Sequence, residues 1–194
     1  MNLPNILTLS RILMIPVFVI IYYLPAQWSY LVSAGLFALA AATDWLDGYL
    51  ARKLNQSTPF GAFLDPVADK LMVAVALTVL IEAHASFILT IPATVIIGRE
   101  IVISALREWM AELGERAKGA VSQLGKIKTV TQMTAITLLL AQKPDFTADG
   151  DIIMNPWLWL SYGLLYLATA FTLWSMGSYL RAAAPQLLKS QSKS

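Results

Sequence analysis

The sequence predicts an all-α fold, a membrane-embedded bundle of six transmembrane helices that forms a single domain over residues 1–194. The first observation is composition: the chain is 57% hydrophobic and 13% charged, with a mean hydropathy of +0.63, which is more apolar surface than a water-soluble domain of this size can bury. The second is that apolar residues gather in stretches near the roughly 20 residues that a spanning helix requires. The third is an uneven distribution of basic residues between the two sides of the bundle.

Each apolar stretch gives one expected helix. In chain order the helices cover residues 6–24, 28–50, 66–81, 87–107, 126–141 and 156–180. The fifth stretch is short and carries several threonines and Gln132, so it is expected to face protein or a water-filled cleft more than lipid. Glycines break the charged connection before it, turn formers fill the loop after it, and the C-terminal tail is expected to fray.

The lysines and arginines set the expected orientation. Six spans place both termini and the second–third and fourth–fifth connections on one side, whose basic residues are Arg11, Arg52, Lys53, Lys70, Arg107, Arg116, Lys118, Lys126, Lys128, Arg181, Lys189 and Lys193. The opposite side carries Lys143. By the positive-inside rule, the basic side and both termini are expected to be cytoplasmic. The sequence pI near 8.9 then reflects attraction to anionic lipid, and no nucleic-acid partner is expected.

Four aspartates stand out in the stretch DWLDGYLARKLNQSTPFGAFLDPVADK, residues 44–70; they are Asp44, Asp47, Asp65 and Asp69. Spacings of three and four residues place each pair of carboxylates on one face of its helix. After a break at Gly61, Pro66 suits the first turn of the third helix, which makes Asp65 the expected N-cap. Two neighbouring helices joined by a short connection can thus direct four carboxylates into one volume.

Such a group of carboxylates indicates a metal site, because the charges repel one another unless cations lie between them. Cysteine is absent, and His84, the single histidine, lies in a turn with no visible partner. Oxygen ligation without thiolate or imidazole points to Mg²⁺, Mn²⁺ or Ca²⁺. We favour Mg²⁺, which binds a few carboxylates and completes its shell with water and substrate phosphates.

Small and basic residues beside the aspartates are candidates for holding a phosphorylated ligand. Gly48 and Ala51 share the face of the two aspartates of the second helix and leave room for close approach. Arg52 follows, where a guanidinium can bind two phosphate oxygens. In the alternative interpretation, the same two aspartates pair with Arg52 and Lys53, and the first aspartate of the next helix merely caps it.

Read as a pattern, the stretch is D-x2-D-G-x2-A-R-x8-G-x3-D-x3-D. Its fixed positions are Asp44, Asp47, Gly48, Ala51, Arg52, Gly61, Asp65 and Asp69. This resembles the signature of the CDP-alcohol phosphotransferases, integral membrane enzymes that make phospholipids. Residues 2–11, 98–109 and 125–133 are in addition similar to the bacterial members that join CDP-diacylglycerol to sn-glycerol 3-phosphate and release CMP.

The resemblance implies a role for each residue of the pattern. Asp44, Asp47 and Asp65 would bind one metal ion and Asp65 and Asp69 a second, with Mn²⁺ as an alternative to Mg²⁺. Asp69 would also accept the proton of the attacking hydroxyl. The CDP-diacylglycerol site would comprise Gly48, Ala51, Arg52, Thr58 and Gly61. The family further implies a homodimer in the bacterial inner membrane, with its active site facing the cytoplasm.

Basic residues of the fourth and fifth helices suit an acceptor that carries its own phosphate. They are Arg99, Arg107, Lys126 and Lys128. Thr8 and Arg11, near the start of the first helix, can join this site or the donor site. The alternative is that Arg99 pairs with Glu100 while the two lysines extend to the lipid headgroups.

Other functions stay open on the sequence. Related enzymes use serine, inositol phosphate or phosphatidylglycerol as acceptor, and the aspartate motif reports the CDP-linked donor alone. Intramembrane prenyltransferases also bind Mg²⁺ on aspartates, but on two motifs in well-separated helices. A cation transporter would need polar groups continuing toward the far side of the membrane, where residues 31–42 and 71–81 are apolar.

Overall fold

A computed structural model describes residues 3–53, 59–112 and 123–191; for some residues inside the helices, among them 45–53, Asp65 and 123–126, it describes the backbone alone. The helices are α1 (Leu3–Tyr22), α2 (Trp28–Lys53), α3 (Pro59–His84), α4 (Phe87–Glu112), α5 (Gln123–Leu140) and α6 (Pro156–Gln191). The described ranges contain no strand, and the loop before α6 holds an isolated antiparallel bridge between Phe146 and Ile152. The predicted all-helical class is confirmed.

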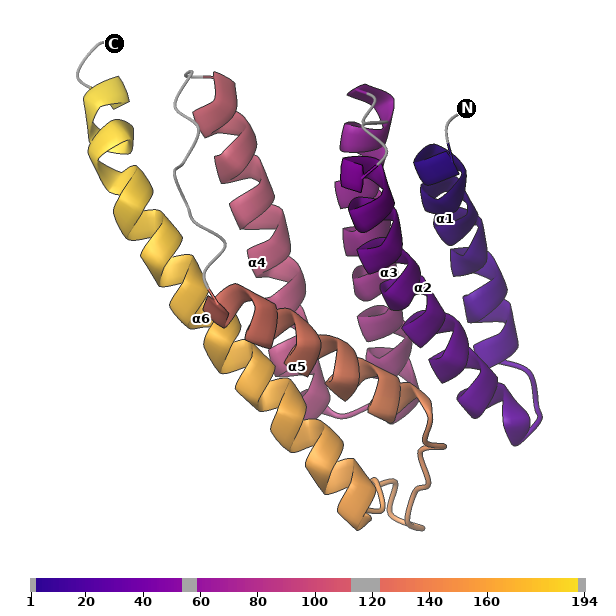
Figure 1. Cartoon of the computed structure of the whole chain (residues 1–194). Coiled ribbons are helices and arrows are strands. Elements are labelled where there is room, and N and C mark those ends of the chain that lie inside the picture. The colour runs from indigo at the N-terminus through magenta and orange to yellow at the C-terminus, as the bar shows by residue number, and fades with distance from the viewer. Residues whose placement is uncertain (1–2, 54–58, 113–122, 192–194) are drawn as a thin grey trace.

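Two groups of helices are joined by α5 (Figure 1). On one side α1 packs against α2 and α3, and on the other α4 packs against α3 and α6. α5 has its most extensive contact with α6 and also touches α2 and α3. The first turns of α1 and the last turns of α6 lie at the same end of the bundle, where α2 ends and α3 begins (Figure 1). The end of α2 and the start of α3 therefore lie at the end of the bundle where α1 also starts.

Apolar and charged side chains are distributed as expected for a protein surrounded by lipid. Large apolar residues point outward on several helices, with Leu13 62%, Leu31 66% and Trp174 72% exposed. The buried charged side chains among the described residues are Arg11, Arg99 and Lys128. Outward apolar surface and buried charges of this kind agree with membrane association.

Within the ranges that the structure describes, two helices are long and apolar enough to span a membrane by length and composition. The spans are Asn5–Tyr22 in α1 and Phe87–Ala111 in α4. A shorter apolar stretch, Ile127–Leu140, forms most of α5. The topology of six spans with cytoplasmic termini remains a prediction.

Most helix boundaries differ from the sequence prediction, and the differences in α2, α3 and α6 bear on the predicted site and tail. α3 begins at Pro59, so Pro66 lies inside the helix and the expectation that Asp65 is its N-cap is wrong. Pro59 rather than Pro66 supplies the fixed φ that suits a first turn, and Gly61 continues the helix without a break. α2 continues to Lys53, and α6 reaches Gln191 because alanines and leucines near its end favour helix, so the tail is helical through that residue.

His84 at the end of α3 has a partner that the sequence did not reveal. Its side chain is 1% exposed, and Nδ1 lies 3.1 Å from the hydroxyl oxygen of Tyr162, which is 78 residues further along the chain. His84 is the last residue of α3 and lies beyond the apolar stretch 66–81. Burial lowers the pKa of His84 to about 4, so its imidazole is neutral at pH 7.

Candidate functional site

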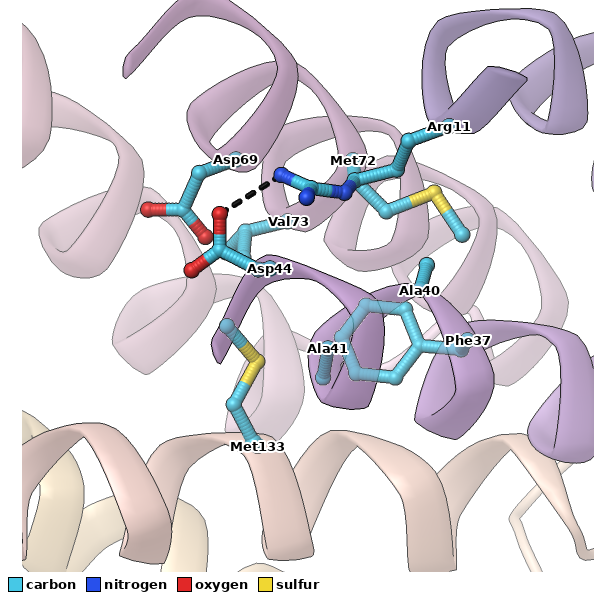
Figure 2. A pocket seen from close by; sticks show the side chains of 9 residues that line it. All are labelled: Arg11, Phe37, Ala40, Ala41, Asp44, Asp69, Met72, Val73 and Met133. Carbon is cyan, nitrogen blue, oxygen red and sulfur yellow. Dashed lines mark hydrogen bonds and ion pairs between the residues drawn. The ribbon is translucent and has the colours of Figure 1, made fainter. Parts of the chain in front are cut away.

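Asp44 of α2 and Asp69 of α3 line one cavity (Figure 2). Arg11 of α1 borders the same cavity, and its apolar wall consists of Phe37, Ala40, Ala41, Met72, Val73 and Met133. In Figure 2 the two carboxylates lie next to each other, and that of Asp44 faces the guanidinium. Successive helical turns supply the lining residues, because positions three and four apart share one face. The structure thus brings together two of the four aspartates that the sequence singled out.

An ion pair connects α1 to this cavity. Arg11 Nη1 lies 2.6 Å from Asp44 Oδ1, with the Arg11 side chain 1% and the Asp44 side chain 41% exposed. Thr8, about one turn earlier on α1, is fully buried. A buried guanidinium needs negative partners, because an uncompensated charge away from water costs several kcal/mol. Arg11 therefore holds the carboxylate of Asp44 in place and offsets its charge.

Several predicted site residues lie outside what the structure describes. They are Thr58, the surroundings of Gly48, and the side chains of Asp47, Ala51, Arg52, Asp65 and Lys126. Gly61 is described and is buried near the start of α3. Among the described side chains, no group of three or more carboxylates or imidazoles forms a metal site. Asp44 and Asp69 offer oxygen ligands alone to their cavity, which is the ligand chemistry that Mg²⁺ and Mn²⁺ prefer.

A second group of charges lies between α4 and α5. Arg99 Nη1 lies 2.8 Å from Glu100 Oε1, and Lys128 Nζ lies 2.7 Å from the same oxygen. The side chains of Arg99 and Lys128 are each 7% exposed, and that of Glu100 is 26% exposed. The pairing of Arg99 with Glu100, considered as an alternative from the sequence, is present. Lys128 does not extend to the surface, because it is buried and bound to the same carboxylate.

Hydrogen bonds to serine hydroxyls connect α4 to two further helices, α6 and α3. Arg99 Nη2 donates to Ser175 Oγ of α6 at 2.8 Å. Lys70, the neighbour of Asp69 on α3, donates to Ser104 Oγ of α4. We refer to Arg99, Glu100, Lys128 and Ser175 as the Glu100 cluster. Its members come from α4, α5 and α6, and Lys70 leads from α4 back to the helix that carries Asp69.

Arg107, the remaining described cation of the predicted acceptor site, lies apart from this cluster. Its side chain is exposed, with the guanidinium carbon 5.0 Å from the centre of the Tyr179 ring. Arg107 Nη2 also donates to the Tyr179 hydroxyl at 3.1 Å. The structure therefore separates the predicted acceptor residues. Arg99 and Lys128 belong to the Glu100 cluster, Arg107 of α4 contacts Tyr179 of α6, and Arg11 lies beside Asp44, with Thr8 about one turn away on α1.

Buried polar atoms near the Glu100 cluster are site features that sequence reasoning missed. Among the described residues, Arg99 Nε, Gln132 Oε1 and Thr172 Oγ1 are buried and have no hydrogen-bond partner. Gln132 follows Lys128 by four positions on α5, and Thr172 precedes Ser175 by three on α6, so each shares a face with a cluster member. For Gln132, the available signal was a polar residue one turn from a basic one in an apolar helix. Buried polar groups without partners are rare in proteins and are explained by water or a ligand.

Comparison with known proteins identifies relatives over almost the whole chain. The sequence model of the CDP-alcohol phosphatidyltransferase family matches residues 1–174. A protein of Pseudomonas fluorescens named CDP-diacylglycerol-glycerol-3-phosphate 3-phosphatidyltransferase is 58% identical over 188 residues, which cover 96% of this chain and 92% of that protein. Proteins of the same name from Escherichia coli K12 and Salmonella typhimurium LT2 are 50% identical over 190 residues, covering 96% of this chain and 97% of theirs.

Proposed function

The chain belongs to the CDP-alcohol phosphatidyltransferase family, and from this premise we propose that it is a phosphatidylglycerophosphate synthase. It transfers the phosphatidyl group of CDP-diacylglycerol to sn-glycerol 3-phosphate, giving phosphatidylglycerophosphate and CMP. The names of relatives at 50% and 58% identity support the acceptor. Family membership also favours this function over an intramembrane prenyltransferase or a cation transporter.

One structural observation carries the proposal: Asp44 and Asp69 line a single cavity that Arg11 borders. Two carboxylates from adjacent helices at one cavity provide the ligands and the base that a phosphoryl transfer requires. The family generally uses divalent metal ions. We assign Asp44, Asp47, Asp65 and Asp69 as the ligands of two Mg²⁺ ions, with Mn²⁺ as the alternative. When bound, these ions neutralise charge on the diphosphate of the donor.

Asp69 is assigned as the general base. As the acceptor hydroxyl attacks phosphorus, Asp69 takes its proton, an oxygen–phosphorus bond forms to the acceptor, and the bond to the CMP oxygen breaks. The chain has no cysteine, so direct displacement is favoured over a thiol-linked intermediate. The apolar residues Met72, Val73 and Met133 line the cavity beside Asp69 and limit access of water, which would otherwise hydrolyse the donor.

The acceptor phosphate is assigned to Arg99 and Lys128, and Lys126 and Arg107 are retained as further candidates from the sequence. One carboxylate between two buried cations leaves an excess positive charge, which suits a phosphate dianion. For the donor we retain Gly48, Ala51, Arg52, Thr58 and Gly61 as the CDP-diacylglycerol site. Thr8 and Arg11 of α1 are retained as candidates for the donor or the acceptor site.

We also propose that the protein crosses the bacterial inner membrane six times, with both termini and the active site facing the cytoplasm, and that it forms a homodimer. The outward apolar side chains and the common end at which α1 begins and α6 ends support the topology (Figure 1). The accumulation of basic residues on that side supports the orientation.

A substrate comparison tests the proposed function. Purified protein in detergent, given CDP-diacylglycerol and Mg²⁺, is expected to release CMP when sn-glycerol 3-phosphate is added. The same assay is run with serine, with inositol phosphate and with phosphatidylglycerol. Release with one of these but not with glycerol 3-phosphate would overturn the acceptor and leave the reaction class intact. Absence of CMP with every acceptor would overturn the reaction class.

A further inference from the structure

Glu100 occupies a position between the two buried cations assigned to the acceptor phosphate. Both cations contact the same carboxylate oxygen, Oε1, from different helices, at 2.8 Å for Arg99 and 2.7 Å for Lys128. Without this carboxylate, the two positive charges would face each other in a region of low dielectric constant, where repulsion is poorly screened. Glu100 therefore allows both cations to be buried together.

The contacts to Glu100 leave donors available on both cations. A lysine ammonium has three donors, of which Lys128 gives one to Glu100. A guanidinium has five, of which Arg99 gives one to Glu100 and one to Ser175, while its Nε is buried and has no partner among the side chains that the structure describes. The carboxylate and the Ser175 hydroxyl thus fix the plane of the guanidinium without using all of its hydrogen bonds.

We propose that Glu100 is a positioning residue for the acceptor: it holds Arg99 and Lys128 in the arrangement that binds the phosphate of sn-glycerol 3-phosphate. The inference rests on the proposed function and deepens it. Glu100 is not assigned any contact with the reacting atoms. Its effect is to remove the cost of assembling two like charges when the acceptor arrives, which is the energetic benefit of a preorganised site.

The primary test is the Glu100→Gln variant, which keeps the size of the side chain and removes its charge. The KM for glycerol 3-phosphate is expected to rise by about tenfold or more, as misplacement of binding groups usually produces. The KM for CDP-diacylglycerol is expected to stay within about twofold, because the donor does not depend on the cluster. Glu108→Gln, an exposed change on the same helix, is the matched control and should match the wild type.

Two further variants separate positioning from a general structural role. Glu100→Asp keeps the charge at a shorter reach and should give an intermediate KM. If Glu100 acts by holding Lys128, the double variant Glu100→Gln/Lys128→Gln should bind the acceptor about as weakly as Lys128→Gln alone. Equal losses for both substrates, or fully additive losses in the double variant, would overturn the inference. A lower KM for glycerol 3-phosphate in Glu100→Gln would also overturn it, since Glu100 would then compete with the phosphate.

A binding measurement without turnover separates this inference from the proposed function. Inorganic phosphate is titrated into detergent-solubilised protein in the absence of donor, and the unfolding temperature is followed. The wild type and Glu108→Gln are expected to be stabilised, and Glu100→Gln to lose most of this stabilisation. That result supports the role of Glu100 even if glycerol 3-phosphate is not the acceptor. Equal stabilisation of all three proteins would overturn the role of Glu100 even if glycerol 3-phosphate is turned over.

Discussion

Arg11 and Asp44 form an ion pair between α1 and α2, with Nη1 2.6 Å from Oδ1. The guanidinium is almost fully buried, whereas Asp44 is partly exposed and lines the cavity that also holds Asp69 (Figure 2). Each residue of the pair therefore fixes the position of the other. Arg11 is held at its depth by the carboxylate, and Asp44 is held at the cavity wall by a charge from another helix.

Removal of this guanidinium is the first prediction. Arg11→Gln is expected to lower the rate of CMP release by about tenfold or more, because Asp44 loses the contact that orients it in the cavity. The rate is compared with that of Arg181→Gln, an exposed change on α6 that should behave as wild type. Wild-type activity of Arg11→Gln, in protein that remains monodisperse in detergent, would contradict the orienting role.

Removal of the proposed base is the second prediction. Asp69→Asn keeps the size and most of the hydrogen-bonding capacity of the side chain but cannot accept the acceptor proton at neutral pH. The rate of CMP release should fall by about 10²- to 10⁴-fold, the usual contribution of general base catalysis. The control is Asp145→Asn in the exposed loop before α6. Turnover within a few-fold of wild type would exclude Asp69 as the base.

Metal dependence is the third prediction. Chelation with EDTA is expected to abolish CMP release, and Mg²⁺ or Mn²⁺ to restore it, because the carboxylates of the cavity are hard oxygen ligands. Asp44→Asn should raise the Mg²⁺ concentration needed for half-maximal activity by about tenfold or more, since it removes one anionic ligand. Full activity in EDTA, or an unchanged Mg²⁺ requirement in Asp44→Asn, would argue against the assignment.

The pairing of the aspartates could be predicted from sequence because it depends on local spacing. Asp44 lies in the second half of α2 and Asp69 in the first half of α3, and the two helices are consecutive, so a short connection brings the two residues to a similar depth in the bundle. The predicted start of α3 was wrong because two prolines, Pro59 and Pro66, both suit a first turn, and local preference does not decide between them. The helical class itself followed from composition.

Contacts between distant helices could not be predicted in the same way. Arg11 and Asp44 are 33 residues apart, and Lys128 and Glu100 are 28 apart. Each pair depends on how α1 packs against α2, or on how α5 crosses between the two helix groups, and neither follows from periodicity. The sequence therefore supplied the cations as candidates, while their division into one group beside Asp44 and another around Glu100 required the tertiary structure.

The fourth prediction concerns stability against acid and depends on His84. Burial lowers the pKa of this imidazole from 6.5 to about 4, so below pH 6.5 the unfolded chain binds a proton that the folded protein excludes. The contribution of neutral His84 to the free energy of unfolding is therefore fully present above about pH 6.5. It declines as the pH falls toward 4, by at most about 1.4 kcal/mol per pH unit. The unfolding temperature of detergent-solubilised protein is measured between pH 7.5 and 5 for the wild type and for His84→Gln.

The chain has a single histidine, so His84→Gln removes the whole imidazole contribution in this range. The variant is expected to be less stable at pH 7.5, because the contact with the Tyr162 hydroxyl is altered, yet to lose less stability than the wild type on acidification. Tyr162→Phe is the complementary variant, since it removes the contact and keeps the imidazole buried. It should therefore retain the acid sensitivity of the wild type. Identical pH profiles for wild type and His84→Gln would show that His84 does not determine stability in acid.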